Sequence, residues 1–278
     1  MAKLREIDRR WIFLCVAAAL LITVRYSFKQ PITPSPSVKS VYDYIQKLPP
    51  GSAVLIATDF DPSAKAELEP MTQALLEHCF KRNLRVIGMT FWYQGLTLAN
   101  RIFKDVATRY GKTSGVDYAF LGFKYGDAGL IITGMGESFT SVFPQDAGNE
   151  PTVNMQIFRE VKSLRDVRYM IDIAAGVTVG TWIIFGSDKF SIPMAAGCTA
   201  VSAPDYYVFT NTGQLNGIIG GLRGAADYEV LLRQPGLAVS GMAAQSTVHA
   251  IIVLFVIVGN VVYFWGRRAR GRRTEPRP

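Results

Sequence analysis

The sequence has few of the residues that most often carry catalysis or bind metal ions. Its 278 residues include two histidines and three cysteines. Two histidines do not build the usual zinc clusters without help from carboxylates, and the Gly-x-Ser-x-Gly motif of many serine hydrolases is absent. No catalytic set is complete, and we therefore expect no metal site and no cofactor.

The scarce histidines and cysteines have ordinary structural explanations. His78 lies on a predicted helix with a charged end, so we expect it at the surface. Cys15 falls in an apolar run, while Cys79 and Cys198 lie far apart in the chain. Two cysteines do not make a disulfide framework, so we expect two buried free thiols, with a single disulfide between them left open.

The body of the sequence also lacks an excess of charge. The formal net charge is +8, but the first ten residues carry +2 and residues 267–278 carry +5, which leaves +1 for the remainder. A protein that binds nucleic acid needs a basic surface on its folded domain. The distribution predicts no nucleic-acid partner and places the positive charge at the two ends.

Both clusters of positive charge flank uncharged apolar runs. Residues 11–24 carry no charge, and the adjoining residues extend this run to 11–28. No small-x-small cleavage site follows, so we predict an uncleaved signal anchor rather than a signal peptide. Residues 250–266 form the second run, which ends in Tyr263 and Trp265, as expected at a membrane interface. The sequence predicts one transmembrane helix at each end.

These two runs also predict the membrane topology. Positive residues beside a span stay in the cytoplasm, so both termini should be cytoplasmic and the middle of the chain periplasmic, in a bacterial inner membrane. The predicted order is a cytoplasmic N-terminus (1–10), a transmembrane signal anchor (11–28), a proline-rich tether (29–37), an extracytoplasmic domain (38–236), a stalk (237–249), a second transmembrane helix (250–266) and a basic cytoplasmic tail (267–278). Residues 237–266 are long enough to form one continuous helix.

The central domain alternates apolar strand patterns with helical patterns. We predict strands over residues 53–58, 84–90, 117–123, 130–133, 169–174 and 192–199, and helices over 38–48, 71–82, 96–110, 153–164 and 213–232. Ser37 is the expected N-cap of the first of these helices, and Pro70 should lie in the first turn of the second. This alternation is typical of an α/β domain with a mostly parallel, doubly wound (Rossmann-like) sheet.

Small residues recur on the last predicted helix. Gly217, Gly220, Gly221 and Gly224 include pairs four residues apart, a spacing that lets two backbones approach closely. The helix then packs either on its own sheet or against another subunit. The second explanation makes these glycines an interface with a membrane-protein partner or with a second copy of the chain.

The end of the first strand carries an acidic motif. Residues 53–58 run into Asp59-Phe60-Asp61, which resembles the first motif of the haloacid-dehalogenase phosphotransferases, and Thr90 at the end of the second strand is similar to that family's second motif. The resemblance implies a Mg²⁺-dependent enzyme with Asp59 as nucleophile, Asp61 as acid/base and Lys124 as the family's lysine. Its later acidic pair has no counterpart here, because Asp172 lies inside its strand.

Gly134 and Gly136 follow the fourth predicted strand and resemble the start of a dinucleotide-binding loop, although Phe139 stands where the third glycine is needed. A lone Gly-x-Gly is a weak signal, and an ordinary turn is the favoured explanation.

These observations favour a non-enzymatic, extracytoplasmic α/β module, anchored twice in the membrane, that serves as an accessory or scaffold subunit of a membrane protein complex. One alternative is the Mg²⁺-dependent phosphotransferase or phosphatase. A second is a module that binds a small solute at the strand ends, where ligands bind in doubly wound sheets.

Overall fold

The computed structural model describes residues 9–26 and 32–271. The chain divides into two compact units, one of residues 32–239 and one that contains the two terminal segments, 1–31 and 240–278. Residues 1–8, the end of the predicted signal anchor with the start of the tether (27–31), and the end of the basic tail (272–278) lie outside the described residues.

The larger unit is an α/β domain built on one parallel sheet, as the alternating pattern predicts. Its six strands stand in the order β3-β2-β1-β4-β5-β6, and every neighbouring pair is parallel. The order reverses between β1 and β4, which makes this pair the switch point of a doubly wound sheet. The strands are β1 (Ala53–Asp59), β2 (Arg85–Thr90), β3 (Tyr118–Phe123), β4 (Val167–Ala174), β5 (Met194–Cys198) and β6 (Ile218–Gly220).

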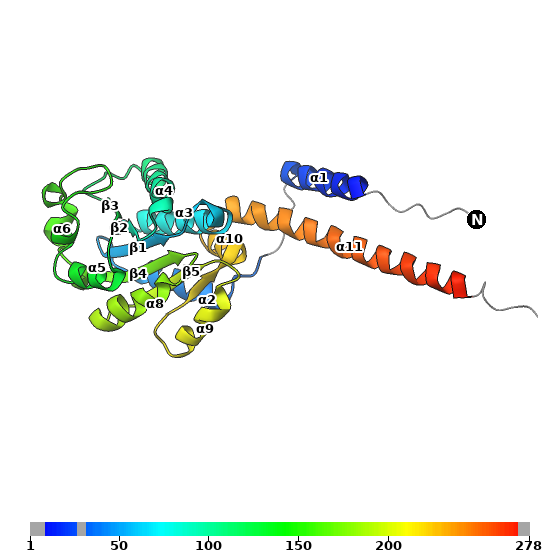
Figure 1. Ribbon diagram of the computed structural model, residues 1–278. Helices are drawn as coiled ribbons and strands as arrows, with labels where there is room; N and C mark the ends of the chain where they lie inside the picture. Colours follow the sequence, from blue (N-terminus) through cyan, green and yellow to red (C-terminus); the bar gives the residue numbers. More distant parts are fainter. Residues whose placement is uncertain (1–8, 27–31, 272–278) are drawn as a thin grey trace, which may run out of the picture. The chain divides into compact units, whose positions relative to one another are not determined.

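Helices cover both faces of the sheet (Figure 1). One face carries α3 (Lys65–Lys81), α4 (Leu96–Arg109) and α10 (Gly221–Leu231), and α2 (Pro36–Lys47) packs against α10 and β6. The other carries α5 (Ala128–Met135), α8 (Thr178–Trp182), the π-helical turn η5 (Ile183–Asp188) and α9 (Ala203–Asn211). Shorter elements are η1 (Pro62–Ala64), η2 (Tyr93–Gly95), α6 (Phe139–Val142), η3 (Thr152–Asn154), α7 (Ile157–Glu160) and η4 (Leu164–Asp166).

The strands are apolar runs in the sequence because helices cover both faces of the sheet. Every residue of β1 is buried, and Gly88 in β2 leaves room for a ring. A Cβ at Gly88 would lie 2.4 Å from the ring of Phe103 on α4, so this glycine lets the helix approach the sheet closely.

Three sequence predictions are wrong in the kind or extent of the element. Residues 130–133 belong to α5, which Asp127 caps by accepting the N–H of Leu130, because a short apolar run is compatible with a helix as well as a strand. Residues 153–164 are not one helix but the separate turns η3, α7 and η4. Residues 213–232 divide into a turn, the short edge strand β6 and α10.

Two helix starts also differ from the predictions. The N-cap of α2 is Ser35, whose hydroxyl accepts the N–H of Val38, and Pro36 is the first helical residue. Helix α3 begins at Lys65, so Pro70 lies inside it rather than in its first turn.

Both edges of the sheet are covered by the chain itself. At β6, the hydroxyl of Ser37 donates to the carbonyl of Ile218 at 3.1 Å and accepts its N–H at 2.7 Å. At β3, the N–H of Ala147 donates to the carbonyl of Phe120 at 3.0 Å. Blocked edges disfavour the addition of another chain's strand.

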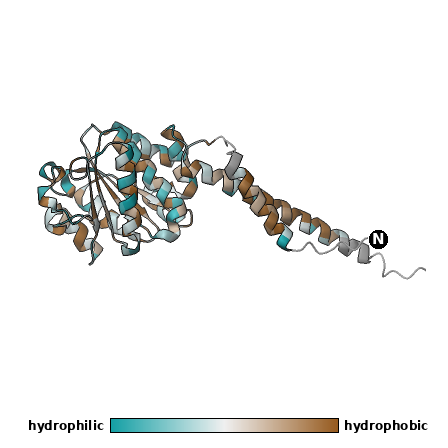
Figure 2. Cartoon of the chain, turned by 90° about the horizontal axis from the view of Figure 1, so that it is seen from above, coloured by the Kyte–Doolittle hydropathy of each residue, from teal (hydrophilic) through white to brown (hydrophobic). Residues whose placement is uncertain are grey.

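The second unit contains the two terminal helices, α1 (Arg9–Tyr26) and α11 (Leu237–Gly271), and the first residues of α11 belong to the larger unit. The predicted stalk (237–249) and the second apolar run (250–266) form one continuous helix, α11. Apolar residues cover much of its length in Figure 2. Among the described residues, one helix, Leu237–Trp265, is long and apolar enough to cross a membrane, and the apolar part of α1, Arg10–Thr23, is shorter. The two helices run antiparallel (Figure 1), and the Thr23 hydroxyl donates to that of Thr247 at 3.1 Å.

Candidate functional site

The carboxyl edge of the sheet at the switch point holds two buried carboxyl groups. Asp59 is the last residue of β1, and Asp172 in β4 pairs with Ala57, two residues earlier in β1. Because side chains two residues apart point to the same face of a sheet, Asp59 and Asp172 lie diagonally next to each other. Both side chains are essentially inaccessible to solvent.

Asp59 accepts two N–H groups from neighbouring segments. Its Oδ1 accepts the backbone N–H of Phe91, after β2, at 2.6 Å. Its Oδ2 accepts the indole Nε1–H of Trp182, on α8, at 3.3 Å. Both oxygens therefore act as acceptors, which suits the ionised form of the carboxyl.

Asp172 has the complementary arrangement. Its Oδ2 accepts the hydroxyl of Thr178 at 2.9 Å, whereas its Oδ1 is buried and no N–H or hydroxyl of the described residues reaches it. The negative charge of Asp59 disfavours a second charge beside it, so Asp172 is the carboxyl that retains a proton. Burial raises the pKa of Asp59 to about 6, and burial together with the Asp59 charge raises the pKa of Asp172 well above its ordinary value.

The crevice outside this pair is filled by aromatic side chains. A Cβ on Gly176, after β4, would lie 2.9 Å from the ring of Trp92, after β2, so the indole lies against the Gly176 backbone. The rings of Phe91 and Trp182 pack with centroids 5.7 Å apart. The Tyr206 hydroxyl donates to the Gly176 carbonyl at 2.6 Å and fixes the same loop from the α9 side. Side chains thus occupy the usual ligand position of a doubly wound sheet.

The residues of the phosphotransferase resemblance have separate partners. Asp61 is partly exposed and caps η1 by accepting the N–H of Ser63 at 2.8 Å, and its hydrogen bonds to Ser63 lower the pKa of its carboxyl. The Thr90 hydroxyl donates to the carbonyl of Thr58 at 2.8 Å. The Lys124 ammonium lies 5.8 Å from the centroid of the Phe143 ring. Within the part of the chain that the structure describes, no three His, Cys, Asp or Glu side chains gather in a way that could hold a metal ion.

Gly134 and Gly136 do not follow a strand. Gly134 lies in α5 and Gly136 is its C-cap. A Cβ at Gly136 would lie 2.0 Å from the ring of Phe190, so the end of the helix is packed against that ring. The two glycines serve helix packing rather than a loop opening onto a ligand.

The four glycines of the predicted last helix are spread over several elements. Gly217 precedes β6, Gly220 ends it, Gly221 opens α10 with a φ of +60°, and Gly224 lies within α10. A Cβ at Gly217 would lie 2.4 Å from the carbonyl oxygen of Ser37, and one at Gly224 would lie 3.0 Å from the backbone of Ile219. Their close approaches are to their own domain, which is the first of the two explanations that the sequence left open.

The scarce histidines and cysteines can now be placed. His78 is buried rather than at the surface: its Nδ1 accepts the hydroxyl of Tyr228 at 2.8 Å, and its Nε2 donates to Oε1 of Gln46 at 2.9 Å. Burial, with smaller effects from the charges of Arg82 and Lys81, lowers the pKa of His78 to about 3. The prediction that His78 lies at the surface is wrong because α2 and α10 cover this part of α3. Cys79 and Cys198 are buried free thiols, as expected.

Large apolar side chains are exposed in the loops after four strands. Tyr93 follows β2, Tyr125 follows β3, Val177 follows β4 and Val201 follows β5, with exposed fractions of 67%, 90%, 86% and 87%. Because all strands are parallel, these loops lie along one edge of the sheet, and we call the four residues the apolar rim. Exposed apolar side chains along one edge of a sheet are candidates for contact with a protein or a membrane. Sequence reasoning concentrated on the polar residues at this edge and missed the rim.

Helix α10 holds both chain connections of the domain. On the N-terminal side, Asp227 accepts the N–H of Ser35 at 3.0 Å, and Arg223, paired with Asp227, donates to the carbonyl of Thr33 at 3.1 Å. On the C-terminal side, the buried carboxylate of Glu229 accepts the N–H groups of Gly236, Ala238 and Val239 at 2.7–2.9 Å. A carboxylate at a helix N-terminus is favoured by the helix dipole, so Glu229 fixes the start of α11.

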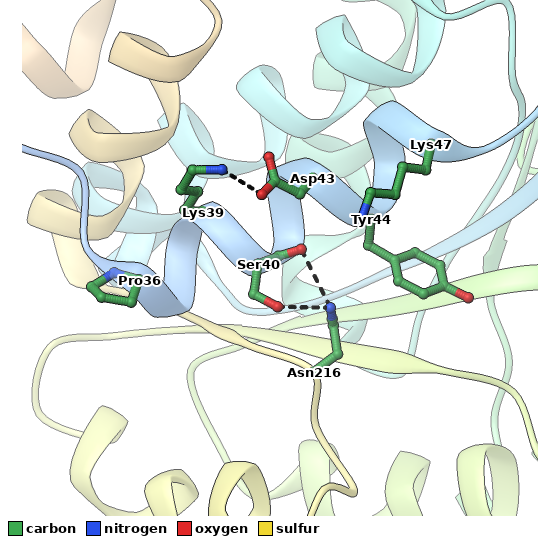
Figure 3. Close-up of a pocket in the computed structure, with 7 residues that line it drawn as sticks. All are labelled: Pro36, Lys39, Ser40, Asp43, Tyr44, Lys47 and Asn216. Carbon is green, nitrogen blue, oxygen red and sulfur yellow. Dashed lines mark hydrogen bonds and ion pairs between the residues drawn. The ribbon is translucent and has the colours of Figure 1, made fainter.

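The pocket in Figure 3 lies apart from the switch point, between α2 and the segment before β6. It has a volume of 350 Å³, and its polar groups pair with each other: Lys39 with Asp43, and Asn216 with the Ser40 hydroxyl at 3.2 Å. The Asn216–Ser40 hydrogen bond ties α2 to the segment before β6, and the Lys39–Asp43 pair lies within α2.

Comparison with known proteins assigns no family, since no family model and no curated protein matches this chain.

Proposed function

We propose that this chain is a two-pass inner-membrane protein whose periplasmic α/β module has no catalytic role and serves as an accessory or scaffold subunit of a membrane protein complex. The observation that carries the proposal is the closed switch point. Asp59, which would be the nucleophile of phosphoryl transfer, is buried and accepts hydrogen bonds from Phe91 and Trp182, whereas Asp61, which would be the acid/base, caps η1. A nucleophile must reach its substrate, and Asp59 is fully enclosed.

The terminal helices support the two-pass arrangement. An antiparallel pair joined by the Thr23–Thr247 hydrogen bond brings both termini to the same side of a membrane. Threonine hydroxyls commonly link helices in membranes, where a polar group gains by finding a partner. The apolar part of α1 is short, and the arginines beside it can extend toward the lipid headgroups.

The apolar rim supports a partner for the module. The edges of the sheet are blocked by Ser37 and Ala147, so strand addition is disfavoured. The rim offers apolar side chains that lose contact with water when a partner binds. We place the partner's binding surface at Tyr93, Tyr125, Val177 and Val201.

Cysteine labelling of intact cells tests the topology. The exposed Cys15 is first replaced by alanine, since Cys79 and Cys198 are buried. Ser114→Cys, exposed on the domain, should then react with a membrane-impermeant maleimide, and Thr274→Cys should react only after lysis. The reverse pattern would overturn the topology.

Purification of the full-length protein in mild detergent tests the scaffold. Tyr125→Ser combined with Val177→Ser should lose a co-purifying membrane protein that the parent retains. Val153→Ser is the matched control, because Val153 is 71% exposed in η3, away from the rim. Equal recovery with all variants would remove the rim as the docking site. Mg²⁺-dependent phosphatase activity lost in Asp61→Asn, a change at a partly exposed residue, would instead favour the enzyme.

A further inference from the structure

The second apolar run of α11, residues 250–266, contains one amide side chain, Asn260. Asn260 is exposed, and it makes none of the hydrogen bonds found among the described residues. A side-chain amide carries both donors and acceptors, and leaving them unpaired in hydrocarbon is unfavourable. An amide at this depth is therefore stabilised when another polar group meets it.

Asn260 points away from α1. The partly buried side of α11 includes Ala243, Thr247, Ile251 and Phe255, a stripe at four-residue spacing with Thr247 bonded to α1. At about 100° per residue, Asn260 lies roughly half a turn around the helix from this stripe. The contact with α1 thus leaves the amide on the free side.

The residues on the free side of α11, which faces away from α1, are regularly spaced. Residues 249, 253, 256, 260 and 263 follow one another at alternating spacings of four and three, which is the spacing of a coiled-coil seam. We call His249, Val253, Val256, Asn260 and Tyr263 the outer stripe. All five are exposed, with Val253 at 56% and Val256 at 57%. A β-branched residue and an asparagine at successive a positions favour a parallel two-stranded pairing in one register.

We propose that two copies of this chain pair along the outer stripe, with Asn260 of each copy hydrogen-bonded to Asn260 of the other. The proposal rests on the proposed membrane insertion of α11. Two inserted copies share one orientation, so their α11 helices run parallel and their Asn260 side chains lie at the same depth. An amide is complementary to itself, and a two-fold axis lets each side chain donate to and accept from its twin. A different partner would need its own polar group at that depth.

Cysteine cross-linking of the full-length protein in native membranes tests the pairing. In a Cys15→Ala background, Val256→Cys on the outer stripe should form a disulfide-linked dimer under mild oxidation. Val258→Cys is the matched control, because it is exposed on the opposite side of α11. Equal cross-linking at both positions would show random collision and overturn the proposal.

Variants of Asn260 test the role of the amide. Asn260→Leu in the Val256→Cys protein should lower the cross-linked fraction by weakening dimerisation roughly tenfold, the effect expected for loss of an interhelical polar contact in a membrane. Asn260→Gln should retain it. Cross-linking unchanged by leucine, or an adduct with a different protein in place of the dimer, would overturn the pairing. Recovery of the chain in the soluble fraction would overturn membrane insertion as well, so the two failures are distinguishable.

Discussion

Asp59 and Asp172 lie diagonally next to each other across the switch point of the sheet, and burial together with the charge of Asp59 raises the pKa of Asp172 well above its ordinary value. Through Phe91 and Trp182, Asp59 joins the end of β1 to the loop after β2 and to α8. Its role is to hold the strand ends together.

The first prediction is that the two carboxyls respond oppositely to amidation. Asp172→Asn keeps a donor toward Asp59 and an acceptor for Thr178, so it should fold. Asp59→Asn places an NH₂ group against one of two N–H donors, and an unsatisfied buried group costs about 1–3 kcal/mol. Chemical denaturation of the full-length protein in mild detergent at pH 7 checks this. Equal loss of stability in both variants would contradict the assignment of the proton to Asp172.

The pH dependence of the same pair has a definite sign. Folded-state pKa values above the unfolded value of 3.8 mean that the folded chain binds more protons. The contribution of the pair to stability therefore falls as the pH rises from about 4 through the raised pKa values, and the penalty is complete above them. Asp172→Asn should be more stable than the parent at pH 8, with the difference shrinking toward pH 4.

The second prediction concerns His78. Its pKa of about 3 lies below the ordinary 6.5, so the neutral ring stabilises the fold at pH 7, and this contribution is lost as the pH falls from 6.5 toward 3. His78→Leu leaves the Tyr228 hydroxyl and Gln46 without their partner, at a cost of about 1–3 kcal/mol at pH 7. The difference from the parent should shrink on acidification. His249→Leu, at the exposed second histidine, is the control and should leave the stability of the α/β domain unchanged.

The third prediction concerns the start of α11. Glu229→Gln removes one of the two carboxylate oxygens that accept three N–H groups, and we expect a loss of about 1–3 kcal/mol. Amide hydrogen exchange should accelerate at Gly236, Ala238 and Val239. Glu160→Gln serves as the control, since Glu160 is half exposed and pairs with Arg85 at the surface, where an ion pair contributes about 0–1 kcal/mol. Unchanged exchange in Glu229→Gln would show that the carboxylate does not fix the helix.

The fourth prediction contrasts two glycines. A Cβ at Gly95 would lie 2.0 Å from the carbonyl oxygen of Phe60, so Gly95→Ala forces two backbones apart. A Cβ at Gly180, inside α8, meets nothing within 4 Å, and alanine there should stabilise the helix by about 0.5–1 kcal/mol. Thermal melting of both variants checks the signs; a stabilising Gly95→Ala would contradict the close approach.

The sequence predicted the α/β class and five of the six strands, because buried parallel strands form apolar runs that end at turns. It failed where the local pattern is ambiguous. The apolar residues around Leu130 suit a strand until Asp127 caps them as a helix. The three residues of β6 are too few to show a period, so they were included in a single predicted helix over residues 213–232.

The site was harder to predict because its contacts join distant segments. Asp59 and Asp172 are 113 residues apart in the sequence, and their pairing depends on the register of β1 against β4. His78 was placed at the surface because it lies at the charged end of its own helix, whereas its burial comes from α2 and α10, elsewhere in the chain. Asp59 and Asp61 resemble a catalytic motif in sequence, but the fold turns one inward and the other outward.

The attachment of both connections to α10 makes the domain equivalent to a long insertion in a two-helix hairpin. The chain enters the domain at Thr33 and leaves it at Gly236, and side chains of α10 bind the backbone at both points. A module whose two ends are fixed on one helix can be transplanted: residues 33–236 could be grafted into a surface loop of an unrelated host, as is common for domains with neighbouring termini. The hairpin left behind would need only a short turn to rejoin its helices.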